Sequence, residues 1–460
     1  MNPALAPVIV GAGPAGIRAA QTLARHGVRP VVIDEAASWG GQIYRQPPAN
    51  FQRSGASLYG FEASRATAVH RAMTGVLERV DYRPRTLVWS AEAGELDVLH
   101  RGRTSTVPYS HLVVATGATD RVLPFPGWTI PGVFTIGGAQ VALKYQGCAI
   151  GTRVVFLGTG PLLYAVAYQY AKAGAEVMAV LDTTGLGPKL AAAPALLRRP
   201  AVLAKGIYYL AWLRVHGIAL HEGVRPVRVL GTQRVAGVVW NDGHHERELA
   251  CDAIGFGYAL RSETQLADIL GCGFTFDPLQ RAYRPGHNVA GRSSVPGVYL
   301  AGDGAGILGA DAAEWAGERA ALALLEDAGV PVDGARAATL ERRLARIAAF
   351  GAGLERAFPF PAGWAAGAAD DLIICRCEEI TAGDLRGAVK DAGAHELNRL
   401  KALTRVGMGR CQGRVCGLAA AEILAHASGR EPRAVGRLRS QAPIKPIPFT
   451  VVETGPEKPA

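Results

Sequence analysis

The sequence lacks a long apolar run, has few cysteines for its length and is poor in aromatic residues. No stretch of 18 uncharged apolar residues occurs in the 460-residue chain, which argues against an ordinary transmembrane helix. The nearest is AVLAKGIYYLAWLRV at 201–215, which Lys205 and Arg214 interrupt. This segment predicts a packing helix or, alternatively, a peripheral contact with the inner membrane. With seven cysteines and no evident signal peptide, the expected compartment is the reducing cytoplasm.

Aromatic residues are nearly absent from the C-terminal part of the chain, where basic residues are frequent. From Cys375 onward there are 14 Lys and Arg against nine Asp and Glu, and Phe449 is the single aromatic residue. Nucleic-acid binding by base stacking is therefore not expected. A solvated basic face and a surface for an acidic protein partner are the alternatives. Over the whole chain, 57 glycines and 49% hydrophobic residues indicate two to four domains of α/β layers.

Four of the cysteines form two close pairs near the C-terminus. CRCEEIT contains the first pair and GMGRCQGRVCG the second; the residues are Cys375, Cys377, Cys411 and Cys416. Four thiolates suit iron–sulfur ligation or tetrahedral zinc. Paired zinc ligands are usually separated by two to four residues. Cys375 and Cys377 are separated by Arg376 alone, a spacing shorter than is usual for zinc. Gly409, Gly413 and Gly417 would let backbone N–H groups approach the sulfurs. The spacing favours [2Fe-2S], with zinc or a disulfide as alternatives.

An early segment reads VIVGAGPAGIRAAQTLARHGVRPVVIDE, a glycine-rich turn between two apolar runs. Gly11 permits a tight turn, Gly13 lets backbone amides meet a pyrophosphate, and Gly16 lets the helix pack on the strand. An acidic residue about 20 positions further on, Asp34 or Glu35, would bind ribose hydroxyls. The order of strand, turn, helix, strand and acid predicts a dinucleotide site.

A second motif of the same kind occupies residues 153–182 but departs from the pattern. Its turn contains Gly158 and Gly160, whereas Leu163 stands where close helix packing needs glycine or alanine. Asp182 at the end of the second strand would favour NAD over NADP. We expect this fold to be retained with a weakened or empty nucleotide site.

The rest of the chain contains shorter patterns. They predict a small β-meander within 50–110, a helical insertion at 183–215, a hairpin at 224–243 and helices at 331–370. Buried strands end at Thr116 and at Asp303, whose carboxylate between two glycines suits a polyol.

These motifs together resemble a family. GAGPAG, VIDEAASWGGQIYRQ, VVATGATDR, PFPGWTIPGVFTIGGAQ and VYLAGDGAGILGA are similar to the flavoprotein disulfide reductase superfamily. The C-terminal CRCEEIT and LKALTRVGMGRCQGRVCG resemble the bacterioferritin-associated-ferredoxin type of [2Fe-2S] domain. Both in this order, over nearly all of residues 7–445, resemble the alpha subunits of bacterial hetero-oligomeric FAD/[2Fe-2S] dye-linked amino-acid dehydrogenases. That group includes opine oxidase, hydrogen cyanide synthase and D-hydroxyproline or proline dehydrogenases.

The resemblance implies an α/β fold with two dinucleotide-binding, Rossmann-like domains and a small helical [2Fe-2S] domain. The expected units are an FAD-binding domain at 1–148 and 266–330, a degenerate NAD-binding-like domain at 149–265, a helical linker at 331–370, the [2Fe-2S] domain at 371–430 and an extended basic tail at 431–460.

The resemblance also implies the cofactors and their residues. FAD, or ATP in its place, would bind at Gly11, Gly13, Pro14, Ala15, Gly16, Glu35, Gly41, Gln42, Ala115, Thr116, Gly117, Gly302 and Asp303. The four paired cysteines would hold the [2Fe-2S] cluster, and FMN at a subunit interface is a further expectation. The chain has no C-x-x-C pair near the flavin motifs, so thiol–disulfide chemistry is not expected.

The function implied is electron transfer within a complex. A D-amino-acid-oxidase-like beta subunit with FAD would oxidise the C–N bond of a D-amino or imino acid, an opine or glycine. Electrons would pass through flavin and [2Fe-2S] to a quinone or another acceptor, with a small ferredoxin-like gamma subunit in some complexes. A stand-alone NAD(P)H-dependent reductase and a nucleotide-binding assembly scaffold are the alternatives. Catalytic residues are not assigned, because His111, His216 and His221 are isolated.

Overall fold

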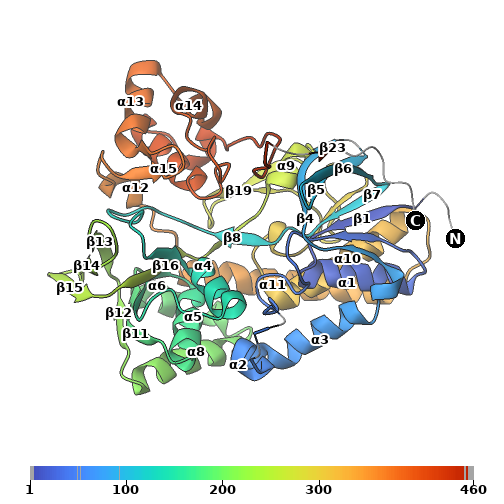
Figure 1. Cartoon of the computed structure of the whole chain (residues 1–460), viewed down its shortest axis with the longest axis horizontal. Helices are drawn as coiled ribbons and strands as arrows, with labels where there is room; N and C mark the ends of the chain where they lie inside the picture. The colour runs from blue at the N-terminus through green and yellow to red at the C-terminus, as the bar shows by residue number, and fades with distance from the viewer. Residues whose placement is uncertain (1–4, 49, 52, 93, 450–451, 454–460) are drawn as a thin grey trace.

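The computed structural model contains two α/β units and a helical C-terminal unit (Figure 1). It describes residues 5–48, 50–51, 53–92, 94–449 and 452–453. The chain leaves the first unit, builds the second, returns to the first and then enters the C-terminal unit. The expected fold class is therefore confirmed.

The first unit is built on a parallel sheet in the order β20-β7-β1-β2-β3. Its strands are β1 (Pro7–Val10), β2 (Val31–Ile33), β3 (Asp81–Arg83), β7 (His111–Val114) and β20 (Val298–Leu300). All four residues of β1 are buried, as expected for a strand covered on both faces. Helices α1 (Pro14–Arg25) and α10 (Ala310–Asp327) pack so closely that a Cβ on Gly317 would lie 1.9 Å from the Ala15 carbonyl oxygen.

An antiparallel meander lies beside this sheet, at the right of Figure 1. It consists of β4 (Thr86–Glu92), β5 (Glu95–His100) and β6 (Arg103–Pro108). The sequence predicts this meander, but it covers less of the chain than 50–110. Residues 55–74 form α2 (Gly55–Tyr59), a 3-10 turn (Gly60–Glu62) and α3 (Ala63–Thr74) instead.

The second unit has its own parallel sheet, in the order β12-β11-β10-β16-β9. The strands are β9 (Val133–Thr135), β10 (Arg153–Thr159), β11 (Glu176–Asp182), β12 (Ala219–Glu222) and β16 (Ala253–Tyr258). β9 pairs with β16, so residues 133–135 belong to this sheet and not to the first domain. The expected domain boundary at 148/149 is therefore wrong for residues 133–135. A strand of three residues has too short a sequence pattern to predict the sheet to which it belongs.

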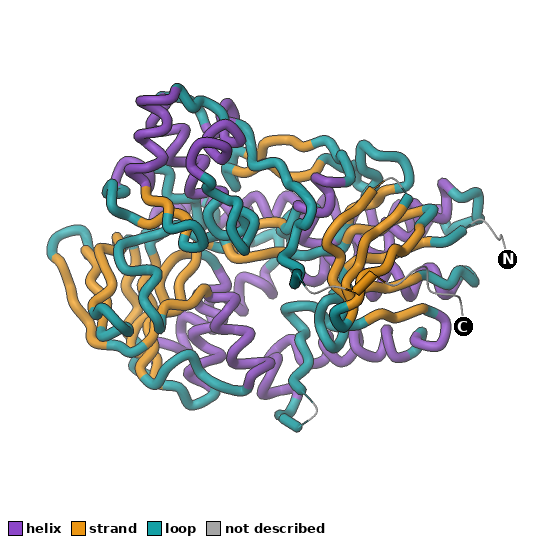
Figure 2. The backbone as a smooth tube through the Cα atoms, turned by 45° about the horizontal axis from the view of Figure 1, so that its top comes forward, coloured by secondary structure: helices purple, strands orange, loops and turns teal. Residues whose placement is uncertain are grey.

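Helices and a small sheet complete the second unit. The elements are α4 (Ile136–Val141), a π-helical turn (Ala142–Gln146), α5 (Pro161–Lys172), α6 (Leu186–Ala191), α7 (Ala193–Leu196), α8 (Pro200–Val215), β13 (Arg225–Leu230), β14 (Gly237–Asn241) and β15 (Glu246–Ala250). The predicted helical insertion and the β13–β14 hairpin are confirmed. Figure 2 shows the strands of this unit separated from those of the first by helices.

A two-stranded connector joins the α/β units, because β8 (Ala118–Asp120) pairs antiparallel with β17 (Leu260–Ser262). Behind it the chain forms α9 (Gln265–Ile269), β18 (Phe274–Asp277), β19 (Ala282–Pro285) and a 3-10 turn (Gly302–Gly304). The long helix α11 (Gly334–Ala357) starts at Asp333, whose carboxylate accepts two backbone N–H bonds.

The C-terminal unit consists of short helices around a two-stranded ribbon, at the top of Figure 1. Its elements are α12 (Trp364–Gly367), β21 (Ile373–Cys375), β22 (Ile380–Thr381), α13 (Ala382–Ala392), α14 (Leu397–Thr404) and α15 (Gly417–Ser428). A capping box between Thr381 and Asp384 starts α13.

The tail returns across the first unit after a 3-10 turn at Pro432–Val435. Ile444 is buried and its N–H donates to the Trp89 carbonyl over 2.8 Å. Strand β23 (Val452–Glu453) then pairs with β6. Residues 450–451 and 454–460 of the predicted tail lie outside the described residues. Within the described part of the chain, none of the helices has the length and hydropathy to cross a bilayer.

Candidate functional site

The first glycine-rich turn has the close backbone contacts that its sequence predicts. Gly11 has φ +106°, and a Cβ there would lie 2.3 Å from the Ala115 carbonyl oxygen. A Cβ on Gly16 would lie 1.8 Å from the Gly11 carbonyl oxygen. Helix α1 starts at Pro14 with no capping side chain, so its first N–H groups are available to an anion.

The two acids after β2 have different environments. Asp34 accepts from the N–H of Ala12 over 2.5 Å and from the N–H of Ala36 over 2.7 Å. Burial raises the pKa of the Asp34 carboxyl, although these amide bonds oppose the shift. Asp34 therefore stabilises the turn through these two hydrogen bonds. The half-exposed Glu35 forms an ion pair with Lys445 of the tail. Among the described residues no hydrogen bond to Glu35 Oε1 is seen, so this oxygen would be free to accept from a ribose hydroxyl.

A second loop lies against the turn. A Cβ on Gly41 would lie 2.9 Å from the Gly13 Cα, and the φ of Gly41 is +64°. Gln42 accepts from the guanidinium of Arg45 over 2.8 Å. The close approach of Gly13 and Gly41 leaves a bare backbone cradle next to the N-terminus of α1.

The loops after β7 and β20 complete the edge of the sheet. Thr116 Oγ1 donates to the Glu263 carbonyl over 2.9 Å, and the Glu263 N–H donates to the Gly117 carbonyl over 2.9 Å. A Cβ on Gly302 would lie 2.9 Å from the Ala15 Cβ. Asp303 Oδ1 accepts from the N–H groups of Leu308 and Gly309, both over 3.1 Å, and burial raises the pKa of this carboxyl.

All predicted residues of the first site therefore lie at the carboxyl ends of neighbouring parallel strands. This is where open α/β sheets bind ligands. The uncapped helix, the glycine cradle and the partly buried Asp303 fit a dinucleotide with its pyrophosphate at α1. Gly11, Gly13, Glu35 and Asp303 would be its main contacts.

We expect Glu35→Ala to weaken retention of the adenine nucleotide. It removes a hydrogen bond to a charged group, worth about 1.5 kcal/mol at a half-exposed position, or roughly tenfold in Kd. Gly13→Val should do worse, because a branched side chain would occupy the pyrophosphate space. Glu92→Ala, an exposed carboxylate on β4, is the control. Nucleotide released on denaturation reports occupancy, and full occupancy in both site variants would contradict the assignment.

The acidic residue of the second glycine motif is bonded within the protein. Asp182 is fully buried and accepts from the Tyr164 hydroxyl over 2.6 Å, the Lys189 ammonium over 2.7 Å and the Thr184 N–H over 2.8 Å. Leu163 is buried in the core of the second unit. The carboxylate expected to select NAD is therefore already bonded within the protein.

The four paired cysteines are brought together in the C-terminal unit. Cys375 ends β21, Cys416 precedes α15, and both are buried, whereas Cys377 is exposed and Cys411 is partly buried. All seven cysteines are free thiols, so the disulfide alternative is not seen. Among the described residues, no three or more His, Cys, Asp or Glu side chains surround a single metal-ion position.

The thiols hydrogen-bond to one another. A hydrogen bond from the Cys416 thiol lowers the pKa of Cys375 to about 6 and that of Cys411 to about 5. The pKa of Cys416 rises well above its usual value, because the neighbouring sulfurs of Cys375 and Cys411 and burial all favour its protonated form. Backbone N–H groups of Gly407 and Gly413 also lower the pKa values of Cys375 and Cys411, respectively. Sulfurs with thiolate character and amide donors suit a [2Fe-2S] cluster.

The glycines near the second pair have two roles. A Cβ on Gly409 would lie 2.4 Å from the Cys377 Cβ, so glycine is needed for this close approach. Gly413 and Gly417 also face the tail, because Cβ atoms there would lie 2.6 Å and 3.0 Å from the Leu438 Cδ1. The sequence predicts that backbone amides approach the sulfurs at these glycines. It does not predict that Leu438 of the tail packs against Gly413 and Gly417.

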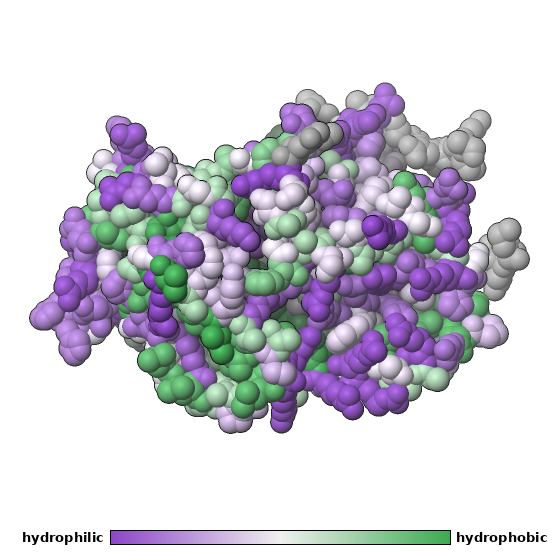
Figure 3. Space-filling view, turned by 90° about the horizontal axis from the view of Figure 1, so that it is seen from below, coloured by the Kyte–Doolittle hydropathy of each residue, from purple (hydrophilic) through white to green (hydrophobic). Residues whose placement is uncertain are grey.

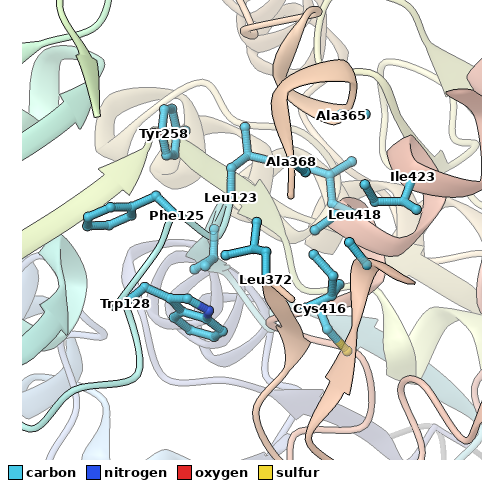
Figure 4. Close-up of a cluster of buried hydrophobic side chains, with 14 of the residues drawn as sticks. Leu123, Phe125, Trp128, Tyr258, Ala365, Ala368, Leu372, Cys416, Leu418 and Ile423 are labelled. Atoms are coloured by element: carbon cyan, nitrogen blue, oxygen red, sulfur yellow. The ribbon is translucent and has the colours of Figure 1, made fainter. Parts of the chain in front are cut away.

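An apolar core joins the C-terminal unit, called the cluster unit below because it carries the four paired cysteines, to the second α/β unit. It contains Phe125, Trp128 and Tyr258 from one side and Leu372, Leu418 and Ile423 from the other (Figure 4). Figure 4 shows Cys416 at the margin of this core, with its sulfur turned away from the apolar side chains. The cluster unit is thus packed on the rest of the chain.

Sequence reasoning missed the side chains that connect the two sites. Glu263 and Arg414 form an ion pair of 2.7 Å, and Arg437 pairs with Asp268 over 2.6 Å. Neither carboxylate belongs to a motif, so no local signal distinguishes it from a surface acid.

Comparison with family models assigns both ends of the chain. Residues 6–328 match the pyridine nucleotide-disulphide oxidoreductase model, and residues 373–426 match the BFD-like [2Fe-2S] binding domain.

Similar proteins cover nearly the whole chain. The opine oxidase A protein of Agrobacterium tumefaciens (strain Ach5), one subunit of that oxidase, is 37% identical over 96% of this chain and 90% of its own length. The hydrogen cyanide synthase subunit HcnB of Pseudomonas aeruginosa is 37% identical over 98% of each chain. L-proline dehydrogenase of P. horikoshii, at 20% identity, superposes with a TM-score of 0.73 over 97% of this chain and 79% of its own and shows the same fold. The chain therefore belongs to the family of opine oxidase A and hydrogen cyanide synthase HcnB proteins, in which a pyridine nucleotide-disulphide oxidoreductase unit precedes a BFD-like [2Fe-2S] domain.

Proposed function

We propose that this chain is the electron-transfer subunit of a flavin-dependent amino-acid dehydrogenase complex. The complex would oxidise the C–N bond of a D-amino or imino acid, an opine or glycine, and deliver electrons to a quinone or another acceptor. The kinship with opine oxidase A and HcnB supports a role as one subunit of an oxidoreductase. The direct test is dye reduction by the co-expressed complex, with the isolated chain as control.

The observation that carries this proposal is the asymmetry between the two dinucleotide motifs. The first has an open glycine cradle, and its Thr116–Gly117 loop is hydrogen-bonded to Glu263, which contacts the cluster unit. The second has its Asp182 bonded to Tyr164 and Lys189. The chain is therefore organised to connect one nucleotide site with the cysteine cluster.

The residues of the chain bind and orient the groups that carry electrons. A flavin accepts two electrons and releases them singly, and a [2Fe-2S] cluster carries one. The backbone around Gly13 and Gly41 would hold the pyrophosphate, and Asp303 would orient the polyol. ATP in place of FAD would use Gly11, Gly13 and Glu35 without Asp303.

FMN at a subunit interface would find on this chain a cavity that is large enough for its phosphate group only. A cavity of about 90 Å³ between the first unit, the cluster unit and the tail is lined by basic side chains: Arg261, Arg281, Lys401, Arg437 and Arg439. Lys401 is buried, with the Gln441 side chain and the Arg439 carbonyl as partners. The cavity would bind the phosphate through these basic side chains, and the ring of FMN would bind against a partner subunit.

Other subunits would bind at two surfaces. The apolar surface of the second unit is formed by exposed side chains of α6, of α8 and of the residue after α7, together with a neighbour from the first unit; they are Phe61, Leu186, Leu190, Leu197, Ile207, Tyr208 and Val215. Figure 3 shows apolar residues gathered on this side of the molecule. An apolar patch of this kind marks a protein–protein contact or, alternatively, a peripheral contact with the inner membrane. The basic C-terminal unit is the second candidate, for an acidic partner. A D-amino-acid-oxidase-like beta subunit is the expected partner, with a ferredoxin-like gamma subunit in addition.

The stand-alone NAD(P)H-dependent reductase is the rival function, and its test is direct. We expect NADH added anaerobically to the purified chain to leave the flavin absorbance unchanged, because Asp182 cannot bind the ribose without losing its bonds to Tyr164 and Lys189. Dithionite is the positive control for bleaching. Rapid bleaching by NADH at micromolar concentration would support the rival. A chain that releases ATP and has no flavin absorbance would favour a scaffold.

A further inference from the structure

One short segment contacts both the first nucleotide site and the cysteine loop 411–416. On one side, the Glu263 carbonyl accepts from the Thr116 hydroxyl and the Glu263 N–H donates to the Gly117 carbonyl. On the other, Gln265 Nε2 donates to the Gln412 carbonyl over 2.5 Å and Arg261 donates to the Arg414 carbonyl over 3.3 Å. Residues 261–265 therefore bridge the two sites.

The Glu263–Arg414 ion pair is the strongest contact in this bridge. Arg414 Nε donates to Glu263 Oε2 over 2.7 Å, and Arg414 Nη2 donates to Glu263 Oε1 over 3.2 Å. The guanidinium and the carboxylate therefore form a bidentate ion pair. The two side chains are only 15% and 10% exposed. Burial alone would raise the pKa of Glu263, but Arg414 and then Arg261 hold it below its ordinary value.

Arg414 has further bonds that fix its direction. Its Nη1 donates to the Ile444 carbonyl over 2.7 Å and lies 3.5 Å from the Cys411 carbonyl oxygen. One guanidinium thus joins the connector, the tail and the cysteine loop. A lysine at this position would keep the charge but not this set of bonds.

The other arginines next to the cysteines are arranged differently. Arg410 is exposed and has no ion-pair partner in the described part of the chain. Arg376 is also exposed and lies over the Trp128 ring at 5.7 Å. Only Arg414 of the three is paired with a residue that holds the Thr116–Gly117 loop.

We propose that Glu263 and Arg414 are positioning residues that hold the cysteine loop 411–416 against the Thr116–Gly117 loop and set the local charge at the cluster. The inference rests on the proposed function for its purpose, since it assigns these residues to the path between the two redox sites. It adds a prediction that packing alone does not make. Because a reduced cluster carries one more negative charge, Arg414 should favour the reduced form and Glu263 should oppose it.

The test is a potentiometric titration of the anaerobic full-length chain, followed by the paramagnetic signal of the reduced cluster. Arg414→Gln should lower the midpoint potential and Glu263→Gln should raise it. Each should change the ratio of reduced to oxidised cluster at fixed potential by up to about tenfold, equivalent to about 59 mV for a one-electron couple. The double variant should return close to the parent. Arg410→Gln is the matched control, with a smaller shift because solvent screens an exposed charge.

Hydrogen exchange on the same samples separates positioning from charge. Amides of 411–416 and of 115–117 should both exchange faster in Glu263→Gln and in Arg414→Lys, whereas Arg414→Lys should keep the midpoint close to the parent. Shifts of the same sign in Glu263→Gln and Arg414→Gln, or unchanged exchange at 115–117, would overturn the inference. If Arg414→Gln fails to load the cluster, Glu263→Gln and Arg414→Lys decide the question.

The titration and the exchange measurement need neither a partner protein nor a substrate. Failure of the proposed complex would therefore leave this inference standing, and the reverse also holds.

Discussion

Replacing Cys411 by serine is expected to remove the visible absorbance and the reduced-state paramagnetic signal of the cluster while the N-terminal nucleotide stays bound. Cys411 is one of the two cysteines whose pKa is lowered, to about 5, so it is well suited to bind iron as a thiolate. The parent chain, purified anaerobically, should contain about two irons with equal acid-labile sulfide. Iron in the variant should fall to a small fraction of this.

The nucleotide should survive this change because the two sites are built on separate units. The Gly11–Gly16 turn contacts Ala115 and Gly41, and within the described part of the chain its backbone hydrogen bonds do not reach the cysteine loop. Cys148→Ser is the matched control, since Cys148 is an exposed thiol next to the second unit's sheet. Stoichiometric zinc without iron in the anaerobically prepared parent would contradict the cluster assignment.

The spacing of residues within short segments was sufficient to predict the glycine-rich turn near the N-terminus and the paired cysteines near the C-terminus. The turn around Gly11 and the pairs around Cys375 and Cys411 depend on residues within a few positions of one another. Backbone geometry over such distances is fixed by the residue types themselves. The family and its fold followed from the order of these motifs, and both are confirmed.

Contacts between distant residues were not predictable in the same way. Glu263 and Arg414 are 151 positions apart, and Asp268 and Arg437 are 169 positions apart. The three residues of β9 have no pattern that reveals the second sheet as their partner. Each of these depends on how the units pack, which no single stretch of sequence specifies.

The chain purified alone is expected not to oxidise amino acids, opines or glycine at a measurable rate, whereas its complex with a D-amino-acid-oxidase-like subunit should reduce an artificial dye. The described residues contain no C-x-x-C pair at the first site, and Asp182 of the second is bonded internally. Cys375→Ser in the complex should leave single-turnover reduction of the partner's flavin unchanged. It should slow the transfer of electrons to a physiological acceptor. Robust turnover by the isolated chain with any amine substrate would contradict the proposed function.

The apolar surface of the second unit supplies a structural test of the same complex. Ile207 and Leu190 are 56% and 70% exposed there, and charging both should weaken assembly, because two desolvated apolar contacts would be replaced by buried charges. Loss of about 2 kcal/mol or more corresponds to roughly a 30-fold higher Kd, which sedimentation or co-purification can measure. Val289→Glu is the matched control, since Val289 is a 47% exposed apolar residue outside this surface. A double variant that assembles normally with its partner but no longer associates with anionic vesicles would assign the surface to the membrane instead.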